Sequence, residues 1–118
     1  TVSHDSHNLC IVFRDAAAGY AAYRALRECG GGMCCVDGAQ TTLLPLPVGG
    51  LMSTATAQEV AAQGLAMKQA LKACGMEQEN PLLRIATLAL PVIPKVKISD
   101  LGLVDVLKKE LMPLFPEA

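Results

Sequence analysis

Aromatic side chains are scarce in this sequence, and tryptophan is absent. Phenylalanine and tyrosine together make up only 3% of the 118 residues. Because large apolar rings are so few, the core has to be built mainly from alanine, leucine, valine and methionine. Apolar residues nevertheless account for 52% of the chain. We therefore expect part of this apolar surface to lie exposed and to meet a large partner surface.

Charge is also sparse and nearly balanced, with 18% charged residues and a net charge of −1. The chain has no block of lysine and arginine, which argues against binding nucleic acid by phosphate neutralisation. The longest apolar stretch, residues 82–93, is interrupted by Arg84 and Pro91, so no membrane span is indicated. The length suits one domain. We expect one domain that binds neither nucleic acid nor a membrane.

The five cysteines are an odd number and show no C-x-x-C spacing. No signal peptide is visible either. This usage favours reduced core cysteines in a cytoplasmic protein. A disulfide between the adjacent Cys34 and Cys35, or a metal site, is the alternative.

Apolar periodicity predicts an α/β (α+β) fold, a single domain with one mostly antiparallel sheet of four or five short strands and about three helices. The expected strands are residues 9–13, 33–36, 41–44 and 95–98, and the expected helices are residues 16–29, 57–74 and 81–89. The third helix is almost entirely apolar, so we expect it to be buried on most sides. In the last strand Lys95 and Lys97 should point outward, as on an edge strand. Residues 103–115 fit either a helix or a segment with a strand at 110–112.

Caps and turns give the boundaries of these elements. Asp15 is expected to cap the first helix, and the Thr56-x-x-Glu59 capping box to open the second. Asp37-Gly38 predicts a hairpin turn. Gly30–Gly32 should contain a positive φ at the end of the first helix. The pair Gly49-Gly50 allows close approach of the backbone to a ligand, a partner or a neighbouring strand.

Polar side chains are concentrated at the start of the chain, in His4, Asp5, Ser6, His7 and Asn8. Both histidines of the sequence lie here, and each of the five side chains can form hydrogen bonds. On a strand, His4 and His7 would point to opposite faces, so they would converge on a metal only if the segment turns. The sequence contains no H-E-x-x-H, G-x-S-x-G or phosphate-loop motif. If the chain has a chemical site, we expect it in this cluster.

Five stretches in order carry a resemblance to a known family. They are residues 4–8 (HDSHN), 30–32 (GGG), 46–53 (LPVGGLMS), 88–94 (LALPVIP) and 102–105 (GLVD). Together they resemble the C-terminal domain of bacterial adenine deaminases, which belong to the amidohydrolase superfamily. The resemblance covers nearly the whole chain and defines residues 1–118 as one adenine deaminase C-terminal-like domain. The family has additional strands before the polar motif, so we expect this domain to be truncated on its N-terminal side.

The resemblance implies an enzyme that hydrolyses adenine to hypoxanthine and ammonia. In such enzymes the catalytic centre lies in a (β/α)₈ barrel that precedes this domain and holds two manganese or iron ions. No metal ligand and no catalytic residue is therefore carried over onto this chain. The implied partners are the barrel, an adenine-type substrate and further copies of the enzyme.

The polar cluster can be carried over as a hypothesis. His4, Asp5 and Ser6 would bind the edges of the purine or assist proton transfer, while His7 and Asn8 would hold the loop. Alternatively, the cluster is a self-contained hydrogen-bond network that fixes a domain interface.

Two other functions stay open. One is a non-catalytic interaction or oligomerisation module that uses the apolar surface near Leu51, Met52 and residues 82–93. The other is a small independent enzyme that uses the polar cluster itself.

Overall fold

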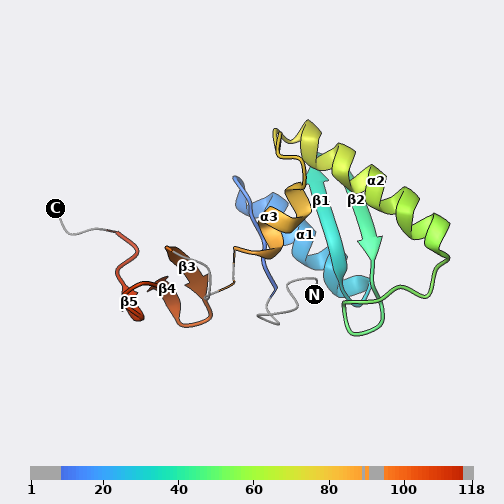
Figure 1. The fold of residues 1–118 in the computed structure, drawn as a ribbon. Helices are drawn as coiled ribbons and strands as arrows, with labels where there is room; N and C mark the ends of the chain where they lie inside the picture. The colour runs from blue at the N-terminus through green and yellow to red at the C-terminus, as the bar shows by residue number, and fades with distance from the viewer. Residues whose placement is uncertain (1–8, 89, 91–94, 116–118) are drawn as a thin grey trace.

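The computed structural model describes residues 9–88, 90 and 95–115 (Figure 1). The elements follow in the order α1 (Ala16–Glu28), β1 (Gly32–Asp37), β2 (Gln40–Pro45), α2 (Ala57–Ala73), α3 (Pro81–Ala86), β3 (Val96–Ser99), β4 (Gly102–Asp105) and β5 (Glu110–Met112). The predicted α+β class is confirmed. The described strands form two antiparallel sheets, β1-β2 and β3-β4-β5, where one sheet was expected.

Helix α1 begins and ends as its sequence predicts. The Asp15 carboxylate accepts a hydrogen bond from the Ala18 backbone N–H at 2.9 Å, which satisfies one of the free donors of the first turn. Arg24 and Glu28, four residues apart on α1, form an exposed ion pair at 3.5 Å. All three glycines of the Gly30–Gly32 run have positive φ, so the chain turns sharply from α1 into β1.

The β1-β2 hairpin lies between the first two helices. Asp37 pairs with Gln40 across a two-residue turn at Gly38. Successive side chains of a strand point to opposite faces. Cys35 contacts Cys74 at the end of α2, so its neighbour Cys34 points to the other face of the hairpin, and α1 also packs against β1. The two helices therefore cover opposite faces of the hairpin.

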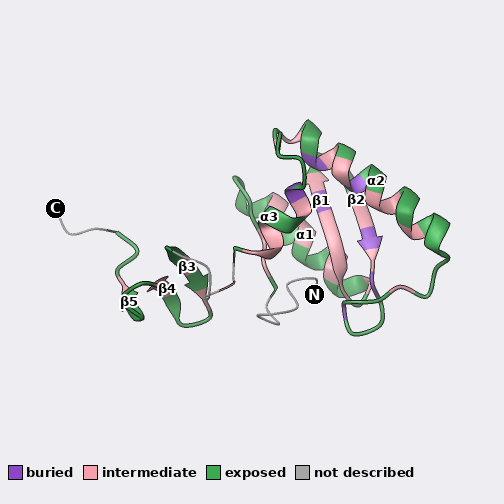
Figure 2. Ribbon diagram, in the orientation of Figure 1, coloured by how far each residue is buried: buried purple, intermediate pink, exposed green. Residues whose placement is uncertain are grey.

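The core lies between the hairpin and α2 (Figure 2). Its buried side chains come from β1, the β2 end and one stripe of α2; they are Cys35, Leu44, Leu46, Met67 and Leu71. The predicted capping box opens α2, with Thr56 and Glu59 exchanging backbone and side-chain hydrogen bonds. Gly75, at φ 92°, ends the helix as expected.

The backbone at Gly31 lies close to the backbone at Gly50, in the loop after β2. A Cβ built on Gly31 would lie 2.8 Å from the Gly50 Cα, closer than real side chains approach backbone. The Gly31 carbonyl also accepts a hydrogen bond from the Leu46 N–H at 2.9 Å. The close approach predicted for Gly49-Gly50 is thus made to the backbone that enters β1.

The predicted strand at residues 9–13 is wrong. This segment has no regular secondary structure, and Leu9, Val12 and Phe13 are exposed. An apolar run becomes a buried strand only beside a partner strand, and the described part of the chain places none next to it. Phe13 packs against Gly19 of α1 instead.

The third helix is shorter and less buried than expected. It ends at Ala86, and Thr87 caps it. Pro81 is buried as the first helical residue, but Leu83 and Leu88 are exposed. The prediction that this segment is buried on most sides is therefore wrong, because only one of its faces meets α2 and the core.

The C-terminal sheet settles the ambiguity of residues 103–115 in favour of strands. β4 and β5 pair through a turn at residues 106–109. β3 is an edge strand, as predicted, and Lys95 is exposed. Lys97, however, is half-buried with its Nζ 3.5 Å from the Thr87 carbonyl, while Val96 and Ile98 are exposed. The predicted orientation of Lys97 is therefore wrong, because no element of the described chain covers this sheet and makes it bury its apolar face.

Among the described residues, no helix combines the length and the apolar character needed to cross a membrane.

Candidate functional site

The predicted site residues His4, Asp5, Ser6, His7 and Asn8 lie outside the described residues. Their roles therefore stay predictions. The described chain begins at Leu9, directly after them.

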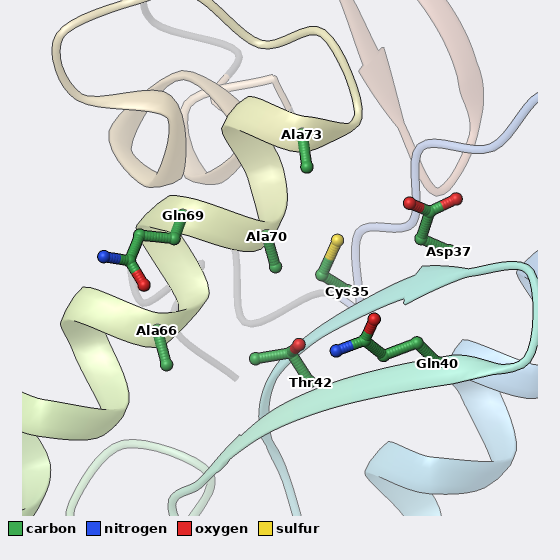
Figure 3. A pocket seen from close by; sticks show the side chains of 8 residues that line it. All are labelled: Cys35, Asp37, Gln40, Thr42, Ala66, Gln69, Ala70 and Ala73. Atoms are coloured by element: carbon green, nitrogen blue, oxygen red, sulfur yellow. The ribbon is translucent and has the colours of Figure 1, made fainter.

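A cavity of about 300 Å³ opens between the hairpin and α2 (Figure 3). Its wall on α2 is made largely of small side chains, which leaves the space unfilled. The lining residues are Cys35, Asp37, Gln40, Thr42, Ala66, Gln69, Ala70 and Ala73. A carboxylate, two amides and a hydroxyl give it several hydrogen-bonding groups beside the alanine methyls. Sequence reasoning did not find this cavity, because its residues on the hairpin and on α2 are far apart in the sequence and are brought together only by the fold.

The cavity does not carry an activated nucleophile. Burial, and next the hydrogen bond with Cys74, raise the pKa of Cys35 from 9.0 to about 12. The thiol is therefore protonated at neutral pH, and the thiolate is the nucleophilic form of cysteine.

Cys35 and Cys74 bring their sulfur atoms within 3.6 Å of each other. One lies on β1 and the other caps the C-terminus of α2. The sequence predicted Cys35 on a strand and Cys74 at the end of the second helix, but these positions are 39 apart in the sequence, so their contact was not predicted. All five cysteines are free thiols, so the alternative of a Cys34–Cys35 disulfide does not occur in this structure.

A metal site does not fit the residues that are described. Within residues 9–88, 90 and 95–115, no three His, Cys, Asp or Glu side chains are grouped so that they could hold an ion. Asp105, the acidic residue of β4, is instead used locally, since its carboxylate accepts hydrogen bonds from the Leu107 and Lys108 N–H groups at 3.0 Å.

Many apolar side chains of the described residues are exposed. We use the term C-terminal apolar surface for the exposed residues on both faces of the β3-β4-β5 sheet and in its flanking turns, which are Val96, Ile98, Leu101, Leu107, Leu111, Leu114 and Phe115. Phe115 alone is 78% exposed. A second group is Val48, Leu51 and Met52 in the loop after β2. The expectation that part of the apolar surface lies exposed is confirmed.

Comparison with known proteins gives a consistent result. The family described as "Adenine deaminase C-terminal domain" matches residues 1–110. The chain is 47% identical over 107 residues to the adenine deaminase of Edwardsiella ictaluri and 46% identical over 109 residues to that of Shigella sonnei. These matches cover 90% and 92% of this chain, but only 18% of each relative. No solved structure matches.

Proposed function

The chain belongs to the adenine deaminase C-terminal domain family, and from this membership we propose that it acts as the C-terminal part of an enzyme that hydrolyses adenine to hypoxanthine and ammonia. The observation that carries the proposal is the identity of 45–47% to adenine deaminases along about nine-tenths of this chain. Because the chain spans only 18% of the length of these relatives, most of the enzyme lies in polypeptide that the match does not include.

The catalytic centre belongs to that larger part. We assign the manganese or iron ions implied by the family to the catalytic barrel. The described residues of this chain hold no group of His, Cys, Asp or Glu side chains that could bind an ion. The described residues of this chain are given no part in the chemical steps of the reaction.

The contribution proposed for this chain is to close the purine pocket. Adenine presents ring nitrogens that accept hydrogen bonds and an exocyclic amine that donates them. His4, Asp5 and Ser6 together supply both kinds of partner, with His7 and Asn8 holding their loop. A pocket built from such groups also discriminates against purines that leave them unpaired.

Docking onto the catalytic part is supported by the C-terminal apolar surface. Burying these exposed apolar side chains against a partner would be favourable. A sheet that is uncovered in the isolated chain gains its missing layer when it packs against a larger domain.

The five free thiols fit a reducing, cytoplasmic setting.

A second candidate function, an interaction and oligomerisation module, is favoured by the same surface. It would use this surface, or the loop with Leu51 and Met52, to join further copies into a homo-oligomer. This role is compatible with the first, because many enzymes assemble through a non-catalytic domain.

The test is a chimera in which residues 1–110 replace the matching stretch of the Edwardsiella ictaluri adenine deaminase. We expect the folded chimera to deaminate adenine, whereas the same relative without the stretch should lose activity or stability. A folded chimera without activity would contradict the proposal.

The pocket role is tested in the same chimera by His4→Ala and Asp5→Ala. Loss of hydrogen bonds to adenine should lower kcat/KM about tenfold or more. Gln58→Ala, at an exposed position of α2, is the control and should leave kcat/KM unchanged. If His4→Ala and Asp5→Ala also leave kcat and KM unchanged, the cluster has only a structural role.

A further inference from the structure

Among the described residues, Cys35 and Cys74 are the only two cysteines whose thiols are joined by a hydrogen bond. Their sulfur atoms lie 3.6 Å apart, and one thiol donates a hydrogen bond to the other. A disulfide has its sulfurs about 2.05 Å apart. Closing the bond therefore requires an approach of about 1.5 Å, which is within reach of small side-chain rotations.

We propose that Cys35 and Cys74 are a site of reversible oxidation, at which a hydroperoxide converts the two thiols into a disulfide that joins β1 to the end of α2. The proposal rests on the geometry of the pair and is independent of the function proposed above.

The cavity between the hairpin and α2 gives access to Cys35. Cys35 lines this cavity, although only 7% of the residue is exposed (Figure 3). Cys74 is less buried and lies where α2 ends. A molecule as small as hydrogen peroxide fits the space, whereas a bulky thiol reagent does not reach the Cys35 sulfur easily.

The reaction balances with one peroxide for each pair. The Cys74 thiolate attacks one peroxide oxygen, the O–O bond breaks, and the leaving hydroxide takes up a proton to become water. Cys74 is then a sulfenic acid. The Cys35 sulfur attacks the Cys74 sulfur, the S–O bond breaks, and the departing hydroxide takes the Cys35 proton as a second water. The two sulfurs lose two electrons in total, which the peroxide accepts.

The order of attack follows from the two environments. Burial and the hydrogen bond with Cys74 raise the pKa of Cys35, so this thiol is the poorer first nucleophile. Cys35 therefore acts second, on the Cys74 sulfenic acid.

The other cysteines are placed away from this reaction. Cys34 points to the α1 face of the hairpin, and the Cys29 thiol donates to the Leu26 and Gly31 carbonyls at 3.5 and 3.2 Å. Adjacent residues of a strand point to opposite faces, so Cys34 and Cys35 cannot pair without breaking β1.

The test is made on the folded 118-residue chain. It is treated with hydrogen peroxide, alkylated under denaturing conditions and digested with trypsin. Cleavage after Arg27, Lys68, Lys72 and Arg84 leaves Cys35 and Cys74 in separate peptides, residues 28–68 and 73–84. We expect these peptides to be joined with a loss of two hydrogens, and the number of alkylated thiols to fall from five to three. A dithiol reductant should restore five.

Two variants and one condition make the result specific. Cys74→Ser should abolish the linked peptide, whereas Cys34→Ser should preserve it, since that thiol lies on the other face. Oxidation in denaturant should give mixed pairings, because the fold no longer selects the partner. The disulfide should also raise the melting temperature by about 5–10 °C, since it constrains the unfolded chain.

Three results would overturn the proposal. They are five alkylated thiols after peroxide treatment, a linkage that survives Cys74→Ser, and a bond that forms between chains. Because the first result is read on the unaltered chain, it does not depend on whether a variant folds.

Discussion

At the scale of single residues, Met67 is the centre of the core. It is fully buried on α2 between the hairpin and the other buried side chains, and its exposed fraction is 0%. A flexible side chain of this kind fills an irregular space in a core that has few aromatic rings. The stability of the fold should therefore depend more on Met67 than on any exposed residue of the same helix.

We predict that Met67→Ala lowers the free energy of unfolding by about 2–5 kcal/mol, because it removes buried surface and leaves a cavity. Leu65→Ala is the matched control on α2, where the leucine is 59% exposed, and it should change stability by at most about 0.5 kcal/mol. Urea unfolding followed by circular dichroism measures both. Equal losses in the two variants would show that α2 does not pack as described.

The Cys35 thiol gives the stability a pH dependence. Its pKa is raised from 9.0 to about 12 by burial and by the contact with Cys74. The folded state holds this proton more tightly than the unfolded state, so the contribution is fully present below pH 9. It is lost as the pH rises toward 12.

We predict that the unaltered chain loses stability between pH 9 and 12 more steeply than Cys35→Ala does. Thermal melts of both proteins under reducing conditions measure the two slopes. The comparison between them removes the titration of lysines and tyrosines, which both proteins share. Parallel slopes would mean that the Cys35 thiol ionises as easily in the fold as in the unfolded chain.

Single residues near helix ends were predictable from the sequence, because caps are local. Asp15, Thr56 and Asn80 each accept the hydrogen bond that their position implies. The contact between Cys35 and Cys74 was not predictable, since it depends on how α2 crosses β1.

At the scale of elements, the connection between α1 and β1 depends on Gly31, whose backbone packs against the backbone of Gly50. Gly31 has φ 118° and leaves no room for a Cβ beside Gly50. The loop after β2 is held against this connection by the hydrogen bond from Leu46 to the Gly31 carbonyl. The turn therefore fixes where the hairpin and its following loop lie.

We predict that Gly31→Ala costs about 2 kcal/mol or more, because both its φ and its contact with Gly50 are violated. Gly38→Ala is the control, since Gly38 also has positive φ but has nothing within 4 Å of its added Cβ. It should cost about 1 kcal/mol, from the backbone conformation alone. Chemical denaturation compares them, and equal costs would contradict the close approach of Gly31 and Gly50.

Elements with clear local signals were predicted well, and elements that depend on a neighbour were not. Helices α1 and α2 and the hairpin followed from caps, periodicity and a turn motif. Residues 9–13 were expected as a strand, but a strand needs a partner that the described chain does not supply there. The same lack of a neighbouring layer leaves Val96 and Ile98 exposed, where a covered sheet would bury one face.

At the scale of the whole molecule, the described chain leaves much apolar surface uncovered. In the described chain, the strands of the β3-β4-β5 sheet contact one another and no other helix or strand, apart from a hydrogen bond that Lys97 donates to the Thr87 carbonyl. Uncovered sheets with unpaired edges tend to associate. In the proposed enzyme the catalytic part would cover this surface.

We predict that the isolated chain self-associates as its concentration rises, and that Ile98→Lys combined with Leu111→Lys reduces this association. Both positions belong to the C-terminal apolar surface, and because they lie on opposite faces of the sheet the double variant adds a charge to each face. Leu65→Lys, an exposed position on α2, is the control and should have a smaller effect. Sedimentation velocity over a range of concentrations measures the association, and a strictly monomeric chain at all concentrations would contradict the prediction.

The candidate site was only partly accessible to sequence reasoning. The resemblance to the family came from five ordered motifs, and the family match over residues 1–110 confirms it. The cavity between the hairpin and α2 was not predicted, because it arises where alanines of one element face polar residues of another. The roles of His4, Asp5 and Ser6 stay predictions.

The central claim is that this chain is an essential but non-catalytic part of an adenine deaminase. The most direct measurement compares hypoxanthine formation from adenine by the purified 118-residue chain and by the chimera with the catalytic part of the Edwardsiella ictaluri relative. We predict no turnover by the chain and turnover by the chimera. Steady conversion of adenine by the chain alone would contradict the account.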